Sequence, residues 1–92
     1  SDREQMPQEN VFSIRLYPNP VSDALYVQIE GAPASSTELR LFDLNGQLVM
    51  QELTNTDQQT AQLNLSALNP GMYLLQVLSG ENQEVRKVLV TR

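Results

Sequence analysis

Leu16-Tyr17-Pro18-Asn19-Pro20 is the stretch of the sequence that decides where the first strand of the fold must end. Two prolines within three positions each hold φ at about −65°, lack a backbone N–H donor and push the preceding residue out of the helical region. A strand that arrives through Phe12, Ile14 and Leu16 therefore stops here, and we expect regular structure to resume at residues 23–24. The stretch predicts a turn between two β-strands.

Outward from this turn, apolar and polar residues alternate with a period of two, and no helical period competes with it. In residues 24–30, for example, Leu25, Val27 and Ile29 share one face. Residues 72–78 form a nearly continuous apolar run, which predicts a central strand covered on both faces. The predicted strands are residues 12–16, 24–30, 37–43, 47–53, 61–65, 72–78 and 83–91. This spacing predicts an all-β fold, an immunoglobulin-like Greek-key β-sandwich of about seven antiparallel strands.

Two of the predicted turns carry residues of chemical interest. Asn45-Gly46 predicts a hairpin with a type I′ turn, in which both central residues need a positive φ. Asp43, just before it, fits an acceptor for turn amides better than a calcium ligand, because the terminal acid of a calcium loop is missing. At the start of the sixth strand, Gly71 suits either a special backbone conformation or a close approach that a Cβ would obstruct, and Tyr73 fits a tyrosine corner.

Composition excludes most catalytic classes. The chain of 92 residues has no cysteine, histidine or tryptophan, so thiolate metal sites and histidine-activated nucleophiles are absent. The acidic residues are scattered over turns and strand ends, with no pair placed across a cleft. A net charge of −5 argues against nucleic-acid binding. We therefore expect no enzyme, no catalytic residue, no metal site and no cofactor.

The first residues differ from the rest. Residues 1–10 contain two glutamines, three acids and no apolar periodicity, which predicts a flexible linker ahead of one domain at residues 11–92. No apolar run is long enough to span a membrane, and no signal peptide is present at the start. Export of such a domain would depend on a signal carried by a longer parent chain.

The last predicted strand is unusual in charge and position. Arg86, Lys87 and Arg92 are three of the six basic residues, and no acid follows Glu84. The strand ends so close to the last residue that nothing follows to cover it. As an edge strand it would offer unpaired backbone groups, which are either protected by charges or used as a template for a partner strand.

Four motifs in order resemble one family. Residues 12–20, ending in Leu16-Tyr17-Pro18-Asn19-Pro20, are followed by Leu41-Phe42-Asp43-Leu44-Asn45-Gly46, by Leu68 and Gly71-Met72-Tyr73-Leu74, and by Lys87-Val88-Leu89-Val90. Together they resemble the C-terminal sorting domain of the type IX secretion system (Por secretion system) over residues 11–92. One departure is that Arg86-Lys87 stands where family members often have two adjacent lysines.

The resemblance implies a secretion signal. It implies a cargo protein that crosses the periplasm, passes the outer-membrane translocon and reaches the cell surface or the medium. The implied partners are the translocon, its shuttle proteins and a sortase-like cysteine peptidase that removes the domain before surface attachment. The implied structural motif residues are Leu16, Tyr17, Pro18, Asn19, Pro20, Asp43, Asn45 and Gly46. The implied recognition residues are Gly71, Tyr73, Val85, Arg86, Lys87, Val88, Leu89, Val90 and Arg92, and the implied cleavage region is Glu4, Gln5, Met6, Pro7, Gln8, Glu9 and Asn10.

Two alternatives stay open. The chain could be an immunoglobulin-like accessory module that binds carbohydrate or protein beside a secreted enzyme, although its few aromatic residues make a poor sugar platform. It could also be a spacer or an oligomerising domain, in which the last strand pairs with its copy in a homodimer.

Overall fold

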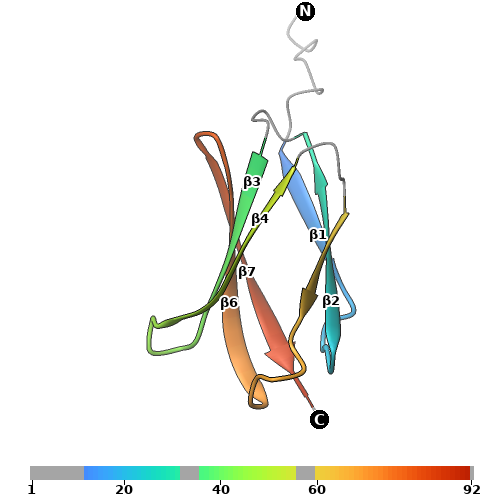
Figure 1. Ribbon diagram of the computed structural model, residues 1–92, viewed down its shortest axis with the longest axis vertical. Helices are drawn as coiled ribbons and strands as arrows, with labels where there is room; N and C mark the ends of the chain where they lie inside the picture. Colours follow the sequence, from blue (N-terminus) through green and yellow to red (C-terminus); the bar gives the residue numbers. More distant parts are fainter. Residues whose placement is uncertain (1–11, 32–35, 56–59, 92) are drawn as a thin grey trace, which may run out of the picture.

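Seven β-strands form in the described part of the chain, as the alternation predicts (Figure 1). The computed structural model describes residues 12–31, 36–55 and 60–91. The strands begin and end within one or two residues of the predicted bounds, because the apolar period and the turn residues set them. They are β1 (Ser13–Tyr17), β2 (Ala24–Glu30), β3 (Ser36–Phe42), β4 (Leu48–Asn55), β5 (Thr60–Asn64), β6 (Gly71–Ser79) and β7 (Asn82–Val90).

The strands lie in two layers. One sheet has the order β1-β2-β5 and the other the order β4-β3-β6-β7, with antiparallel pairing throughout. The chain changes sheet after β2, after β4 and after β5, which is the connectivity of an immunoglobulin-like Greek key. The predicted fold class is confirmed. In Figure 1 the β1–β2 connection and the end of β7 both lie at the lower end of the sandwich.

The core lies between the layers and is built from the predicted apolar positions. Leu25 and Leu63 are register partners in the three-stranded sheet, and Leu39 and Val77 are partners in the other. All four are at most 2% exposed. Their inward direction follows from the period of two, since every second side chain of a strand points to the same face. The buried apolar residues are Val21, Leu25, Val27, Ile29, Leu39, Leu41, Leu63, Leu65, Tyr73, Leu75, Val77, Val88 and Val90.

The predicted type I′ turn at Asn45-Gly46 is wrong. Of the described residues, only glycines have a positive φ, so Gly46 has φ 84° but Asn45 does not. The N–H of Gly46 donates to the carbonyl of Asp43 (3.0 Å), and that of Asp43 donates to the carbonyl of Gln47 (3.0 Å). These bonds close a three-residue loop, and the β3–β4 register shifts beside it. A three-residue loop with a bulge needs only one left-handed residue.

The prediction that β6 is covered on both faces is also wrong. Tyr73, Leu75 and Val77 point inward and are buried, whereas Leu74 and Leu78 on the other face are half-buried. The apolar run arises because β6 lies between β3 and β7, where even outward side chains are partly shielded by neighbours.

No helix in the described residues is long and apolar enough to cross a membrane.

Candidate functional site

The last strand is an edge strand, a position that the sequence left open. β7 pairs with β6 from Asn82 opposite Ser79 to Val90 opposite Gly71, and it lies at the end of its sheet. Only Gly80 and Glu81 separate the two strands, so the closing pair exchanges hydrogen bonds. Even-numbered residues of β7 therefore bond to β6. The backbone groups of residues 83, 85, 87 and 89 point away from it.

The proline-rich turn covers the second half of this outer edge. The side-chain amide of Asn19 donates to the carbonyl of Lys87 (3.0 Å), and its oxygen accepts the N–H of Leu89 (3.1 Å). Val21 continues the contact, because its N–H donates to the carbonyl of Leu89 (2.8 Å) and its carbonyl accepts the N–H of Thr91 (2.8 Å). We call these four bonds the Asn19 clamp. It ties the first motif to the last one.

The clamp corrects the expectation that nothing covers the last strand. The outer edge is covered not by residues after the strand but by the proline-rich turn, since Asn19 lies 70 positions before its partner Leu89. Next to this contact, Val21 and Val90 form a parallel β-bridge. Tyr17-Pro18 and Asn19-Pro20 are both cis peptide bonds, and the side chain of Asn19 reaches the strand from between the two prolines.

The first half of the outer edge stays open. The N–H groups of Gln83, Val85 and Lys87 point away from β6, and they donate no hydrogen bond within the described part of the chain. The carbonyl of Val85 accepts one hydrogen bond from Arg86 (3.1 Å), and it keeps a second lone pair. We call the outward backbone groups of Gln83 and Val85, together with the N–H of Lys87, the β7 edge.

The predicted recognition residues divide between surface and core. Val85 (46% exposed), Lys87 and Leu89 are exposed on the outer face of the sheet. Val88 and Val90 are buried in the core, so a partner of the folded domain cannot touch their side chains. Arg92 lies outside the described residues, as do the implied cleavage residues 4–10.

Charges on β7 are not equivalent. Arg86 pairs with Glu84 at 2.5 Å, both half-buried. Lys87, by contrast, has no ion pair within the described part of the chain. Its charge therefore stays uncompensated on the outer face, beside the exposed Val85.

The two predicted residues at the start of β6 have structural roles. The hydroxyl of Tyr73 donates to the carbonyl of Asn69 (2.7 Å), which confirms the tyrosine corner. Gly71 has φ 151°, and no atom lies within 4 Å of the point that a Cβ would occupy, so its backbone conformation rather than crowding favours glycine. Asp43 also behaves as predicted, since its Oδ1 accepts the N–H groups of Asn45 and Gln47 (2.9 and 3.0 Å).

A polar cluster lies on the outer face of the same sheet. Glu38 accepts hydrogen bonds from Arg40 (2.9 Å) and from the side chain of Gln51. The guanidinium of Arg40 and then the amide of Gln51 hold the pKa of Glu38 below its ordinary value of 4.5. The negative charge of Glu38 and the positive charge of Arg40 cancel, so the cluster carries no net charge.

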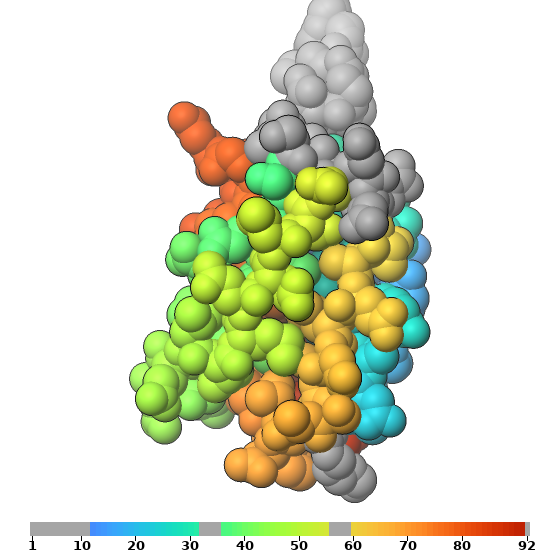
Figure 2. Space-filling view, viewed as in Figure 1, coloured from blue at the N-terminus to red at the C-terminus, as the bar shows by residue number. Residues whose placement is uncertain are grey.

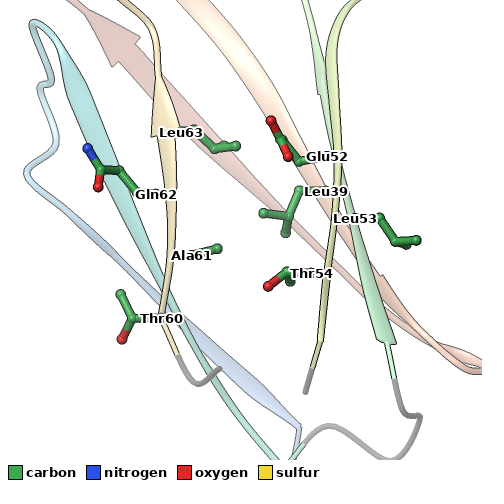
Figure 3. Close-up of a pocket in the computed structure, with 8 residues that line it drawn as sticks. All are labelled: Leu39, Glu52, Leu53, Thr54, Thr60, Ala61, Gln62 and Leu63. Carbon is green, nitrogen blue, oxygen red and sulfur yellow. The ribbon is translucent and has the colours of Figure 1, made fainter. Parts of the chain in front are cut away.

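One cleft lies on the open side of the sandwich, between β4 and β5, and faces the viewer in Figure 2. Its volume is about 430 Å³. Leu39, Ala61 and Leu63 point into it, while Leu53 and Gln62 point away (Figure 3). Of the described residues that line it, Glu52 alone is ionisable. A single carboxylate without a second acid or a base gives no acid–base pair for hydrolysis.

No group of three or more acids, cysteines or histidines lies close enough to hold a metal ion among the residues that the structure describes. The candidate site is the β7 edge with its flanking side chains, because outward backbone groups of this strand have no hydrogen-bond partner there among the described residues. Sequence reasoning missed the part of Val21, whose backbone carries half of the Asn19 clamp. Nothing local marks Val21, because its partner lies at the other end of the chain.

Comparison with known proteins finds a matching family model and a similar solved structure. The family model described as "Secretion system C-terminal sorting domain" matches residues 15–91, from β1 to the end of the Asn19 clamp. Among solved structures, dimeric latent PorU from Porphyromonas gingivalis is similar with a TM-score of 0.58 at 22% identity. The match covers 88% of this chain and 9% of that one, and at this identity it shows a shared fold. A search of curated proteins gave no match.

Proposed function

The chain belongs to the secretion system C-terminal sorting domain family, and on that premise we propose that it directs an attached cargo through the type IX translocon by presenting its last two strands. The observation that carries the proposal is the Asn19 clamp. It joins the first family motif to the last strand and so holds the end of β7 in one defined place. A recognition strand that is fixed before binding loses less conformational entropy when a partner binds it.

The route and partners follow from the family. A translocon and its shuttle proteins bind the folded domain in the periplasm, and a sortase-like cysteine peptidase cuts in the linker, at residues 4–10. The cargo then reaches the outer membrane, the cell surface or the medium. The domain at residues 11–92 performs no reaction itself, and its acids serve turns and ion pairs.

A reporter protein fused ahead of residues 1–92, in a bacterium that has this secretion system, tests the proposal. We expect the full chain to deliver the reporter to the surface, and a fusion that lacks residues 85–92 to leave it in the periplasm. Since that deletion also removes the buried Val88 and Val90, a second variant changes only exposed side chains, Lys87→Glu with Leu89→Ser. Gln62→Ala, an exposed change on the other sheet, is the matched control. Surface delivery of both the deleted and the doubly substituted fusions would disprove the proposal.

An accessory binding module is the second candidate, and one observation favours it. Tyr17 and Tyr26 stack on the outer face of the three-stranded sheet, with ring centroids 5.6 Å apart and planes at 22°. Aromatic faces of this kind hold sugars by stacking. A glycan array with the reporter fusion, repeated with Tyr17→Ala, would support this candidate if a clear signal disappears with the ring.

A further inference from the structure

We propose that the β7 edge is a docking site for one extended segment of a partner protein, which adds to the sheet as a fifth strand. The inference deepens the proposed function, because it names how and where the last strand is bound. Edge strands bind peptides in this way when their outward N–H and C=O groups are free. In this chain those groups are open in the first half of β7, and the Asn19 clamp occupies them in the second half.

The length of the site follows from the Asn19 clamp. The clamp occupies the outer edge from the carbonyl of Lys87 to the N–H of Thr91. What remains open is Gln83, Val85 and the N–H of Lys87. These positions span about 13 Å, since a strand rises about 3.3 Å per residue. The partner strand therefore pairs over roughly five residues and stops where Asn19 begins.

The chemistry of the partner strand follows from the side chains on the outer face. Val85 is 46% exposed and offers an apolar surface, and Lys87 two positions later carries a charge with no acidic partner in the described residues. Directly opposed residues of neighbouring strands lie close enough to interact. The partner should thus carry an apolar residue opposite Val85 and a carboxylate opposite Lys87, two positions apart on the same face.

The same side chains disfavour a second copy of this chain as the occupant. Antiparallel pairing of two β7 edges about Val85 places Lys87 opposite Gln83 of the other copy, so neither lysine meets an acid. A foreign strand with a matching carboxylate satisfies both the backbone and the charge.

Val85→Pro in the reporter fusion separates this docking from the fold. Proline removes the outward N–H of residue 85 but no bond to β6, and edge positions of this kind tolerate proline. We expect surface delivery to fall about tenfold, because the partner loses one hydrogen bond and meets the proline ring. Val85→Thr is the matched control, since it keeps the N–H and the branched shape, and it should deliver within about twofold of the wild type. Arg86→Pro, which removes a bond to β6, should instead lower the melting temperature of the fusion.

Lys87→Glu tests the charge, and we expect it to reduce delivery as Val85→Pro does, with unchanged melting. If Val85→Pro melts early, Gln83→Pro, beside the β6–β7 turn, provides the same test. Normal delivery by the folded proline variants, while deletion of residues 85–92 stops export, overturns the docking site and leaves the proposed function standing. Normal delivery by the deletion as well disproves the function itself. A dimer seen by light scattering that Val85→Pro abolishes assigns the β7 edge to a second copy and overturns the foreign strand.

Discussion

Replacing Asn19 with alanine should loosen the end of β7 without unfolding the sandwich. The side chain makes two hydrogen bonds to the strand, at 3.0 Å to the carbonyl of Lys87 and at 3.1 Å from the N–H of Leu89. Such bonds contribute about 0.5–1.5 kcal/mol each. Asn19 is exposed, so water can replace the lost contacts and the effect lies toward the lower end. We expect the free energy of unfolding to fall by about 1–2 kcal/mol.

Two measurements on the whole chain check this value. Thermal unfolding followed by circular dichroism should show a melting temperature lowered by about 4–16 °C, since 1 kcal/mol shifts a domain of this size by about 4–8 °C. Amide hydrogen exchange measures the stability of individual backbone hydrogen bonds. The N–H of Leu89 should exchange faster in the variant, whereas that of Val77, in the core-facing part of β6, should change only with global stability.

Asn45→Ala is the matched control, because Asn45 is also an exposed turn asparagine but its side chain makes no hydrogen bond in the described structure. It should cost less than about 0.5 kcal/mol. Asn19→Asp keeps the acceptor for Leu89 but turns a carboxylate toward the carbonyl of Lys87, so it should not restore wild-type stability. Unchanged melting together with unchanged exchange at Leu89 in Asn19→Ala would refute the clamp.

Four further changes test the fold and its electrostatics. Leu25→Ala, at 0% exposure, should cost about 2–5 kcal/mol in urea unfolding, and a smaller loss would argue against its core position. Gly46→Val should destabilise by about 1–2 kcal/mol through its φ of 84° alone, since no atom lies within 4 Å of the Cβ position; Gly46→Asn should cost less. Tyr73→Phe removes the 2.7 Å bond to Asn69 and should cost about 1 kcal/mol by the same measurement. Because the pKa of Glu38 is lowered on folding, its contribution is present above pH 4.5 and is lost as pH falls below that value; Glu38→Gln should flatten this part of a stability–pH curve.

The local parts of the fold were predictable because local chemistry decides them. Tyr17 ends β1 since prolines follow it, and Leu25, Val27 and Ile29 share the core face because a strand repeats every two residues. The tyrosine corner of Tyr73 was predicted from a residue type and its place at a strand start.

Predictions failed where the same residues are compatible with two different local structures. An Asn-Gly pair fits a two-residue or a three-residue loop, and the register of β3 against β4 decides which one forms. An apolar run such as that of β6 fits a strand buried on both faces or one shielded by neighbours in its own sheet. Pairing and layer packing settle both questions, and neither is visible in a short window of sequence.

The sequence by itself determined the strand class, the inward face of each strand, the turn at the prolines and the family. Tertiary structure alone decided which strand lies at the sheet edge, how much of that edge stays open, and that Asn19 closes the rest. The physical reason is that a hydrogen bond between residues 19 and 89 depends on the packing of two sheets around one core. Local residue preferences contain no information about that distance.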